Sequence, residues 1–335
     1  MIKRIIITIA ITAGLIVAGL SWLVYDFHGQ LETPMPLVEK SVLKIEPGTS
    51  LRAVSETLVD LGWIEHPYYL IADGRLQGSA ASIKTGEYLV EPGMTPRQLL
   101  ALLVSGKVIQ YPITIPEGWT FRQILAAVRD NPNLLHTLTT TGDDAVMALL
   151  GYPGTHPEGR FFPDTYLFPA GTRDVDFLAR AYRRMDDVLG EEWQARSMGL
   201  PYRDPYEALI MASIIEKETA VPEERGRIAG VFTRRLQKGM KLQTDPTVIY
   251  AAGEKFDGDI RRRDLEIDSP YNTYRYAGLP PTPIAAPGRD SIRAALQPDL
   301  DDNALYFVAM GDGRHHFSET LEEHNRAVAR YQLNR

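Results

Sequence analysis

The sequence has no cysteine among its 335 residues. This absence excludes disulfide bonds, thiolate metal sites, a cysteine nucleophile and a lipidated N-terminal cysteine. It does not identify the cellular compartment, because proteins of oxidising compartments often lack cysteine too.

The sequence also has no excess of positive charge. Its 36 Lys and Arg residues are outnumbered by 43 Asp and Glu residues, and the net charge is −7. Without a basic domain, a nucleic-acid partner is not expected. No G-x-G-x-x-G, P-loop, H-E-x-x-H or G-x-S-x-G motif occurs in a usable context, and the seven histidines form no close i, i+4 pair. We therefore expect neither a cofactor nor a metal ion.

A long apolar run occupies residues 5–25, which carry no charge. At about 1.5 Å per helical residue, such a run spans the ~30 Å hydrocarbon core of a membrane. Lys3 and Arg4 precede it, and Trp22 lies towards its far end, where interfacial aromatic residues belong. We expect a single-pass anchor with its N-terminus in the cytoplasm. A cleaved signal peptide is the alternative, but the run is long for one and no clear small-x-small cleavage site follows.

The chain is long enough for about two folded units. A short strand, a glycine turn and a helix that begins after Ser or Thr recur three times, and Ser50, Thr95 and Thr120 fit the N-cap position. The first two copies, with a helix between them, give a strand–helix–helix–strand layout that resembles the glycan-binding LysM modules. A small α+β spacer without a ligand is the alternative. The expected divisions are a cytoplasmic stub and anchor, a linker, a LysM-like α+β region and a C-terminal domain, at residues 1–28, 29–41, 42–150 and 151–335.

The C-terminal domain is expected to have a mixed α+β fold. Periodic apolar residues predict helices over about 174–198, 204–219, 222–238, 288–297 and 318–333, with a short strand at 305–310.

Two glutamates end the apolar helix that starts at Asp204. At about 100° per residue, Met211 and Ile214 lie within roughly 40° of Glu218, whereas Glu216 points about 160° away from it. Glu218 therefore projects from an apolar face. A carboxyl group that loses its hydration has a raised pKa and can serve as a general acid near neutral pH. The alternative is that Glu218 reaches water or a basic partner in a frayed last turn.

Further polar and aromatic residues follow in three segments. Asp245 precedes Pro246 and so fits a helix N-cap, whereas Gln243 has no such structural reason to be there. Tyrosine faces suit sugar rings, and Asn272 offers both a donor and an acceptor. His324 and Asn325 fit a structural role on a terminal helix. The candidate substrate-binding residues are Gln243, Asp245, Thr247, Tyr271, Asn272, Tyr274 and His315.

Five segments in order carry a resemblance to a known family. "EGRFFPDTY", "ASIIEKETA", "GMKLQTDPTVIYAAG", "YNTYRYAGLPPTPIAAPG" and "HHFSETLEEHN" closely resemble the MltG (YceG-like) endolytic murein transglycosylases, over essentially the whole chain. One departure is Arg234, where the family commonly has an asparagine.

The resemblance implies an enzyme anchored in the inner membrane with its catalytic YceG-like domain, residues 151–335, in the periplasm. Its substrate would be the glycan strands of peptidoglycan, and peptidoglycan synthases are implied as partners. The cleaved bond would be the β-1,4 link from N-acetylmuramic acid to N-acetylglucosamine, with a 1,6-anhydro end as product. The family's catalytic glutamate falls on Glu218. Two alternatives stay open: a hydrolase that uses Glu218 with Asp245, and a glycan-binding scaffold without cleavage activity.

Overall fold

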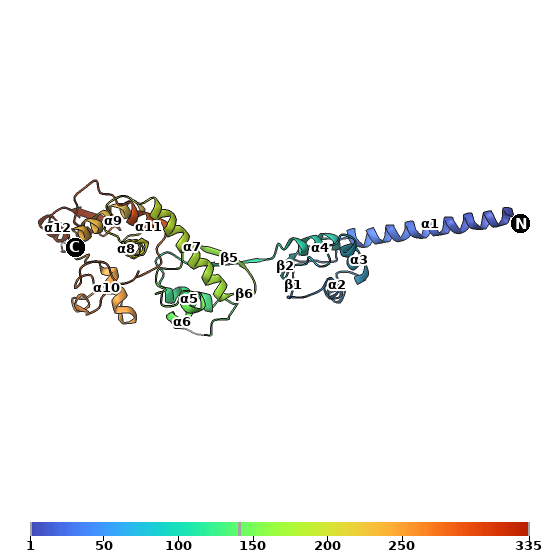
Figure 1. Ribbon diagram of the computed structural model, residues 1–335, viewed down its shortest axis with the longest axis horizontal. Coiled ribbons are helices and arrows are strands. Elements are labelled where there is room, and N and C mark those ends of the chain that lie inside the picture. The colour runs from blue at the N-terminus through green and yellow to red at the C-terminus, as the bar shows by residue number, and fades with distance from the viewer. Residues whose placement is uncertain (1, 140–141, 334–335) are drawn as a thin grey trace. The chain divides into compact units, whose positions relative to one another are not determined.

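The computed structural model describes residues 2–139 and 142–333 (Figure 1). The fold is mixed α+β with an apolar N-terminal helix. Chain contacts divide it into two compact units, Met1–Tyr111 with Phe168–Gly171, and Pro112–Leu167 with Thr172–Arg335. The expected functional boundary near residue 150 stays a prediction.

Helix α1 (Ile2–Glu32) is long and apolar enough to cross a membrane, with a mean hydropathy of 2.2 over a window that is 0% buried. The hydroxyls of Thr8 and Thr12 donate to the carbonyls of Arg4 and Thr8, both at 2.9 Å, so these polar groups are satisfied within the helix. A membrane anchor and a signal sequence share these properties.

The last turn of α1 belongs to the core of the first unit. Leu31 is fully buried, and Met35 is only 3% exposed. Arg97 forms ion pairs with Glu32 and, at 3.2 Å, with Asp73. The segment expected to be a linker, residues 29–41, thus contains two core residues.

The first unit has the expected strand–helix–helix–strand order. The two strands are antiparallel, with Ser41 opposite Val90 and Ile45 opposite Gly86. Ser50 and Thr95 accept hydrogen bonds from backbone N–H groups three residues later, which confirms both N-caps. The elements are β1 (Ser41–Ile45), α2 (Leu51–Asp60), α3 (Pro67–Leu76), β2 (Gly86–Val90) and α4 (Pro96–Ser105).

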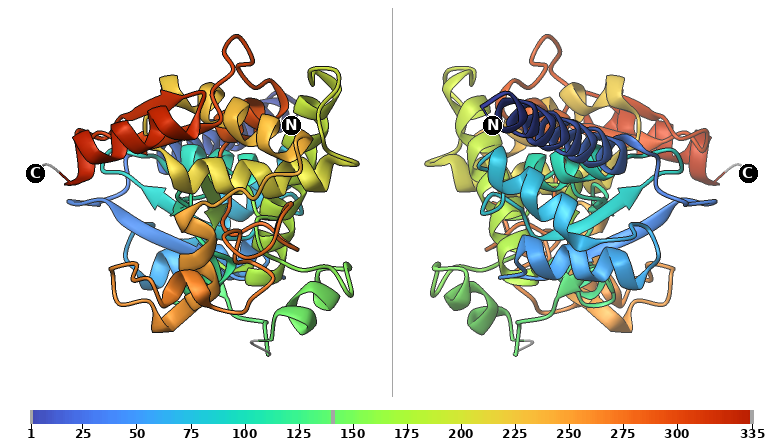
Figure 2. Two further views of the ribbon diagram at one scale, coloured as in Figure 1. Left: turned by 90° about the vertical axis from the view of Figure 1, so that its left-hand side faces the viewer. Right: turned by 90° about the vertical axis from the view of Figure 1, so that its right-hand side faces the viewer.

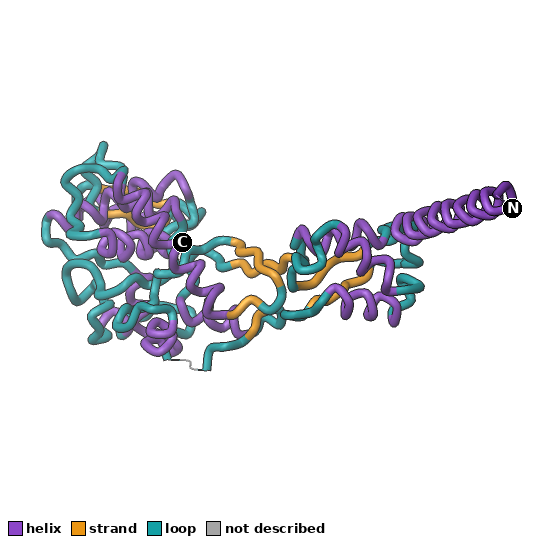
Figure 3. The backbone as a smooth tube through the Cα atoms, turned by 45° about the vertical axis from the view of Figure 1, so that its right-hand side comes forward, coloured by secondary structure: helices purple, strands orange, loops and turns teal. Residues whose placement is uncertain are grey.

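The second unit is mostly helical, with short paired strands (Figure 3). Thr120 caps its first helix through a full capping box with Gln123. The strands pair as β4 with β6 and β7 with β8, and β3 pairs with β5, two strands that cross the unit boundaries given above. The elements are β3 (Gln110–Thr114), α5 (Phe121–Arg129), β4 (Leu134–Leu135), α6 (Asp143–Leu149), β5 (Thr165–Pro169), β6 (Thr172–Arg173), α7 (Asp174–Gln194), α8 (Pro205–Glu218), α9 (Pro222–Gln237), α10 (Asp245–Ala252), α11 (Arg289–Leu296), β7 (Tyr306–Ala309), β8 (His315–Ser318) and α12 (Leu321–Val328).

Helix α8 is the centre of the second unit. Every residue from Ala208 to Ile215 is buried. Helices α7, α9, α10 and α11 all pack against it. At the C-terminal edge of the unit, α12 packs on the β7–β8 hairpin (Figure 2). A helix that is apolar all round is typical of a domain core, so α8 provides a rigid base for whatever its last turn carries.

Two glycines on α9 allow another chain segment to cross the helix closely. The N–H of Asp299 donates to the carbonyl of Gly226 at 2.9 Å. A Cβ atom on Gly230 would lie 1.9 Å from the carbonyl oxygen of Asp299. Because this neighbour is backbone, it cannot swing aside as a flexible side chain would.

We predict opposite effects for alanine at two helical glycines. Gly230→Ala forces the backbone at Asp299 away and lowers the free energy of unfolding by about 1–3 kcal/mol. Gly190→Ala, at a site in α7 with nothing within 4 Å, stabilises the protein by roughly 0.5–1 kcal/mol because alanine favours the helix. Urea denaturation of both variants measures the difference, and equal stabilisation by both would contradict the close crossing.

Candidate active site

The local sequence explains where α8 begins and ends. Asp204 is the N-cap and accepts the N–H of Glu207 at 3.0 Å, while Pro205 takes the first helical position. The carboxylate of Glu207 binds the backbone N–H of Arg203 at 2.7 Å, where a capping box would have it bind Asp204. The helix ends at Glu218, because Thr219 has an extended conformation. Both glutamates of interest therefore lie on its last turn.

The side chain of Glu216 is held by contacts within the protein. Its Oε2 accepts the N–H of Gly288 at 2.9 Å, and Arg225 lies 3.8 Å from its other oxygen. Its side chain is only 7% exposed. Glu216 thus ties α8 to the start of α11, and in the last turn of the helix only Lys217 is exposed. The sequence pattern separated the two glutamates by direction, but it did not indicate that both would be enclosed.

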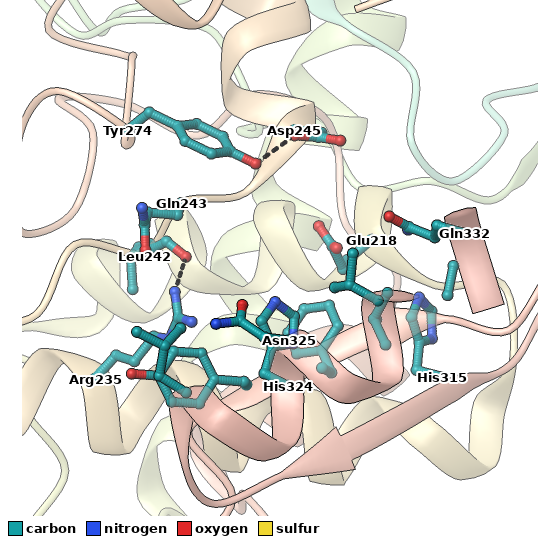
Figure 4. A pocket seen from close by; sticks show the side chains of 16 residues that line it. Glu218, Arg235, Leu242, Gln243, Asp245, Tyr274, His315, His324, Asn325 and Gln332 are labelled. Carbon is teal, nitrogen blue, oxygen red and sulfur yellow. Dashed lines mark hydrogen bonds between the residues drawn. The ribbon is translucent and has the colours of Figure 1, made fainter. Parts of the chain in front are cut away.

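Glu218 lies on the wall of a cavity of about 470 Å³ (Figure 4). Burial raises the pKa of its carboxyl group to about 7. The hydrogen bond from Thr244 opposes this shift, Asp245 adds to it by charge repulsion, and His315 and Arg235 weaken it. Desolvation is the largest of these effects, so the group remains substantially protonated near neutral pH.

Three threonines fix the hydrogen bond to Glu218. The hydroxyl of Thr244 donates to Oε2 of Glu218 at 2.5 Å. The N–H of Thr244 donates to the hydroxyl of Thr273, and its carbonyl accepts from the hydroxyl of Thr247 at 2.7 Å. The hydroxyls of Thr247 and Thr273 lie 2.8 Å apart. Because Thr244 occupies Oε2, Oε1 is the oxygen that can carry a proton towards a ligand.

Asp245 lies on the cavity wall but does not cap its helix. Thr244 has the N-cap position of α10, and Asp245 is the first helical residue. The carboxylate of Asp245 accepts a hydrogen bond from the hydroxyl of Tyr274 at 2.6 Å (Figure 4). The N-cap interpretation of Asp245 is therefore wrong, and its side chain is available to the cavity.

Gln243 has a strained backbone conformation, of the kind often found at functional sites. Its φ angle is +52°, and it has the left-handed conformation that favours glycine. Its N–H donates to the carbonyl of Thr273 at 3.2 Å, which holds this conformation. Gln243 is exposed and lines the cavity.

His315 enters the cavity from β8. Its ring Nδ1 lies 2.8 Å from the carboxylate of Glu224, which also accepts the backbone N–H of His315 at 3.0 Å. This double contact holds the imidazole in place and directs Nε2 away from Glu224. No sequence pattern singled out Glu224 beyond its place in the first turn of α9.

Three of the candidate substrate-binding residues are held inside the protein instead of lining this cavity. Thr247 belongs to the threonine network. The amide nitrogen of Asn272 donates to the carbonyls of Leu265 and Ile267 at 3.0 and 2.8 Å. The hydroxyl of Tyr271 lies 2.8 Å from that of Thr282. A direct substrate contact by these side chains stays a prediction.

The cavity also has residues that the sequence pattern did not select. The guanidinium of Arg235 donates to the carbonyl of Leu242 at 2.7 Å and is nearly buried. His324 and Asn325, expected to be structural, line the cavity from α12 (Figure 4). His324 stacks on Tyr306 with ring centroids 5.3 Å apart. The positions of His324 and Asn325 in a helix did not predict that they line the cavity, because that depends on the packing of α12 against β7.

Arg234, the departure from the family pattern, turns away from the cavity. Its Nε donates to the carbonyl of Ala304 at 2.8 Å, and its guanidinium pairs with Asp302 at 2.8 Å. It therefore fixes the segment that leads into β7. Over residues 2–139 and 142–333, no group of three or more His, Asp or Glu side chains is arranged to hold a metal ion.

Comparisons with known proteins identify the family of the chain. The profile of the YceG-like family matches residues 43–330. An endolytic murein transglycosylase of Bacillus subtilis is 35% identical over 310 residues, which cover 86% of this chain and 84% of that protein. One from Streptococcus pneumoniae is 28% identical over 98% of this chain and 65% of its own length.

A solved structure is also similar. The crystal structure of a yceG-like protein from Listeria monocytogenes shares 31% identity and has a TM-score of 0.53, over 86% of this chain and 98% of that one. The family match and the relatives lead to one conclusion: the chain belongs to the YceG-like family.

Proposed function

We propose that this chain is a lytic transglycosylase that cleaves the glycan strands of peptidoglycan. Its relatives bear the name endolytic murein transglycosylase. The observation that carries the proposal is the Glu218 carboxyl group, which has a pKa raised to about 7 by burial and lies on the wall of a cavity. A carboxyl group that is protonated near neutral pH can donate to a glycosidic oxygen.

In the first step, Glu218 gives its proton to the oxygen between N-acetylmuramic acid and N-acetylglucosamine. The bond from that oxygen to the anomeric carbon breaks, and N-acetylglucosamine leaves with a free 4-hydroxyl. The resulting Glu218 carboxylate keeps the hydrogen bond from Thr244, which favours its ionised form.

In the second step, the muramyl 6-hydroxyl attacks the anomeric carbon, and Glu218 takes its proton. A 1,6-anhydro ring forms and Glu218 is protonated again. Because the nucleophile belongs to the substrate, a single acid/base suffices, and the attack is intramolecular. Gln243, Asp245, Tyr274 and His315 are the proposed sugar contacts in this cavity. Thr247, Tyr271 and Asn272 remain predicted substrate-binding residues that do not line it.

The remaining parts of the chain fit the same role. We propose that α1 crosses the inner membrane once, with Lys3 and Arg4 in the cytoplasm and the catalytic unit in the periplasm. The strand–helix–helix–strand unit is proposed to be a LysM-like module that binds glycan. Peptidoglycan synthases are proposed partners, because they produce the strands that this enzyme would cut.

A matched pair of glutamate variants tests the assignment. Glu218→Gln removes the transferable proton and should abolish strand cleavage, with a loss of at least about 10²-fold in rate. Glu216→Gln weakens the contacts with Gly288 and Arg225, so it should lower stability by about 1–2 kcal/mol while cleavage persists. Digestion of purified glycan strands and thermal unfolding measure the two effects. Cleavage that survives in Glu218→Gln would remove this residue from the mechanism.

The rate should depend on pH through Glu218. Its pKa of about 7 predicts that cleavage declines as pH rises above 7, approaching a tenfold loss per pH unit as the acid form disappears. A kcat/KM profile between pH 5 and 9 measures this. A flat profile would contradict general acid catalysis by this group.

The free energy of unfolding should also depend on pH through Glu218. The pKa of Glu218 is about 7 in the folded chain and near 4.5 as an ordinary glutamate, so proton binding favours the folded state. That contribution is complete below pH 4.5 and is lost as pH rises to 7, by about 3 kcal/mol. The Glu218→Gln variant has no carboxyl group at this position, so it does not lose this stability. The difference in unfolding free energy between the variant and the wild type should therefore shift in favour of the variant from pH 4.5 to 7 and stay constant above pH 7. Urea denaturation at several pH values measures the difference.

Asp245 supports one alternative, because it lies in the same cavity as Glu218. If Asp245 activated water, the enzyme would be a hydrolase with a reducing-end product. Mass spectrometry separates the two: we expect products one water lighter than reducing-end fragments. Reducing ends would support the hydrolase, and no cleavage by the wild type would support a glycan-binding scaffold.

A further inference from the structure

A second cavity of about 910 Å³ lies in the same unit between α5 and α10. Its floor contains Glu158, which is only 4% exposed. One carboxylate oxygen of Glu158 accepts the N–H of Phe121 at 2.9 Å, and the other accepts the hydroxyl of Tyr250 at 3.1 Å. Because Phe121 starts α5 and Tyr250 belongs to α10, Glu158 fixes the spacing of the two walls. The cavity is therefore preformed.

This cavity and the one that contains Glu218 are lined by neighbouring residues of the chain. Lys217 lines the second cavity, and its neighbour Glu218 lines the first. Pro246 lines the second, and its neighbour Asp245 lines the first. Adjacent residues have Cα atoms only about 3.8 Å apart, so the two cavities take lining residues from the same places in the chain, the end of α8 and the start of α10. A branched ligand bound at Glu218 could extend into the second cavity.

The second cavity differs from the first in its positive charges. In the first, the guanidinium of Arg235 is engaged by backbone carbonyls. The second has Lys217 on one wall and Arg122 on another, both exposed. The Nζ of Lys217 has a long contact of 3.3 Å with the carbonyl of Gly118, and Arg122 pairs with Glu254 at the rim.

Acidic side chains share the same walls. Asp143 and Glu254 are exposed at the cavity. A lining with exposed charges of both signs, contributed by α5, α6, α8 and the turn after α10, is poorly matched to neutral sugar rings alone. It is complementary to a ligand with both carboxylates and an ammonium group.

We propose that this cavity binds the peptide branch of the muramyl residue whose glycosidic bond is cleaved. The inference rests on the proposed function, because that function places a muramyl sugar at Glu218. The muramyl lactyl group carries a short peptide with free carboxylates and an amino group. In this proposal Lys217 and Arg122 pair with its carboxylates, and Asp143 and Glu254 pair with its ammonium group.

The test compares glycan strands that carry peptides with the same strands after enzymatic removal of the peptides. The measured quantity is the ratio of kcat/KM for the two substrates, for the full chain in detergent. Lys217→Gln and Arg122→Gln should each lower this ratio several-fold, up to about tenfold, through KM on the peptide-bearing strands.

Two matched controls lie outside both cavities. Lys238→Gln replaces an exposed lysine, and Arg262→Gln replaces an arginine whose side chain is 95% exposed and paired with Glu266. Both controls should keep the wild-type ratio. An unchanged ratio in the Lys217 and Arg122 variants, or a loss that is equal on both substrates, would overturn the proposal.

A binding measurement separates this proposal from the proposed function. Calorimetry with Glu218→Gln protein should show tighter binding of a peptide-bearing disaccharide fragment than of the bare fragment, and Lys217→Gln in that background should remove the difference. Equal binding of the two fragments would contradict the proposed peptide site even if cleavage occurs. If the wild type did not cleave strands but kept the binding preference, only the proposed function would be contradicted.

Discussion

The desolvation of one carboxyl group is the constraint on which the rest of the structure depends. Helix α8 is buried along Ala208–Ile215, and Glu216 and Glu218 in its last turn are partly buried. Glu216 anchors that turn through Gly288 and Arg225, so Glu218 cannot swing out into solvent with a frayed helix end. Desolvation then raises the pKa of Glu218 towards neutrality.

The surroundings of Glu218 moderate this shift. A carboxyl group that never ionised could donate a proton but could not take one back. Thr244 donates to the carboxylate, and Arg235 and His315 favour its charge, whereas Asp245 opposes it. The balance leaves the pKa near 7, where the group can serve as acid and then as base. The strained backbone of Gln243 belongs to the same segment, which is consistent with selection for position over local stability.

Local signals in the sequence predicted the helices well. Expected helices at about 174–198, 204–219 and 222–238 correspond to α7, α8 and α9, which end within a few residues of those limits. These assignments succeeded because periodicity, proline positions and capping residues act over a few residues. The assignment of Asp245 as a cap failed, because a hydrogen bond with Tyr274, twenty-nine residues away, competes for its carboxylate.

The sequence by itself determined the long apolar N-terminal helix, most of the helix starts, the family and the choice of Glu218 over Glu216 as the candidate acid. The tertiary structure alone decided that Thr244 bonds to Glu218, that Glu224 orients His315, that His324 and Asn325 face the cavity, and that the chain neighbours of Glu218 and Asp245 line a second cavity. The physical reason is the distance along the chain over which each effect acts. Helix propensity and amphipathicity are properties of neighbouring residues, whereas desolvation and charge complementarity depend on which distant segments fold together.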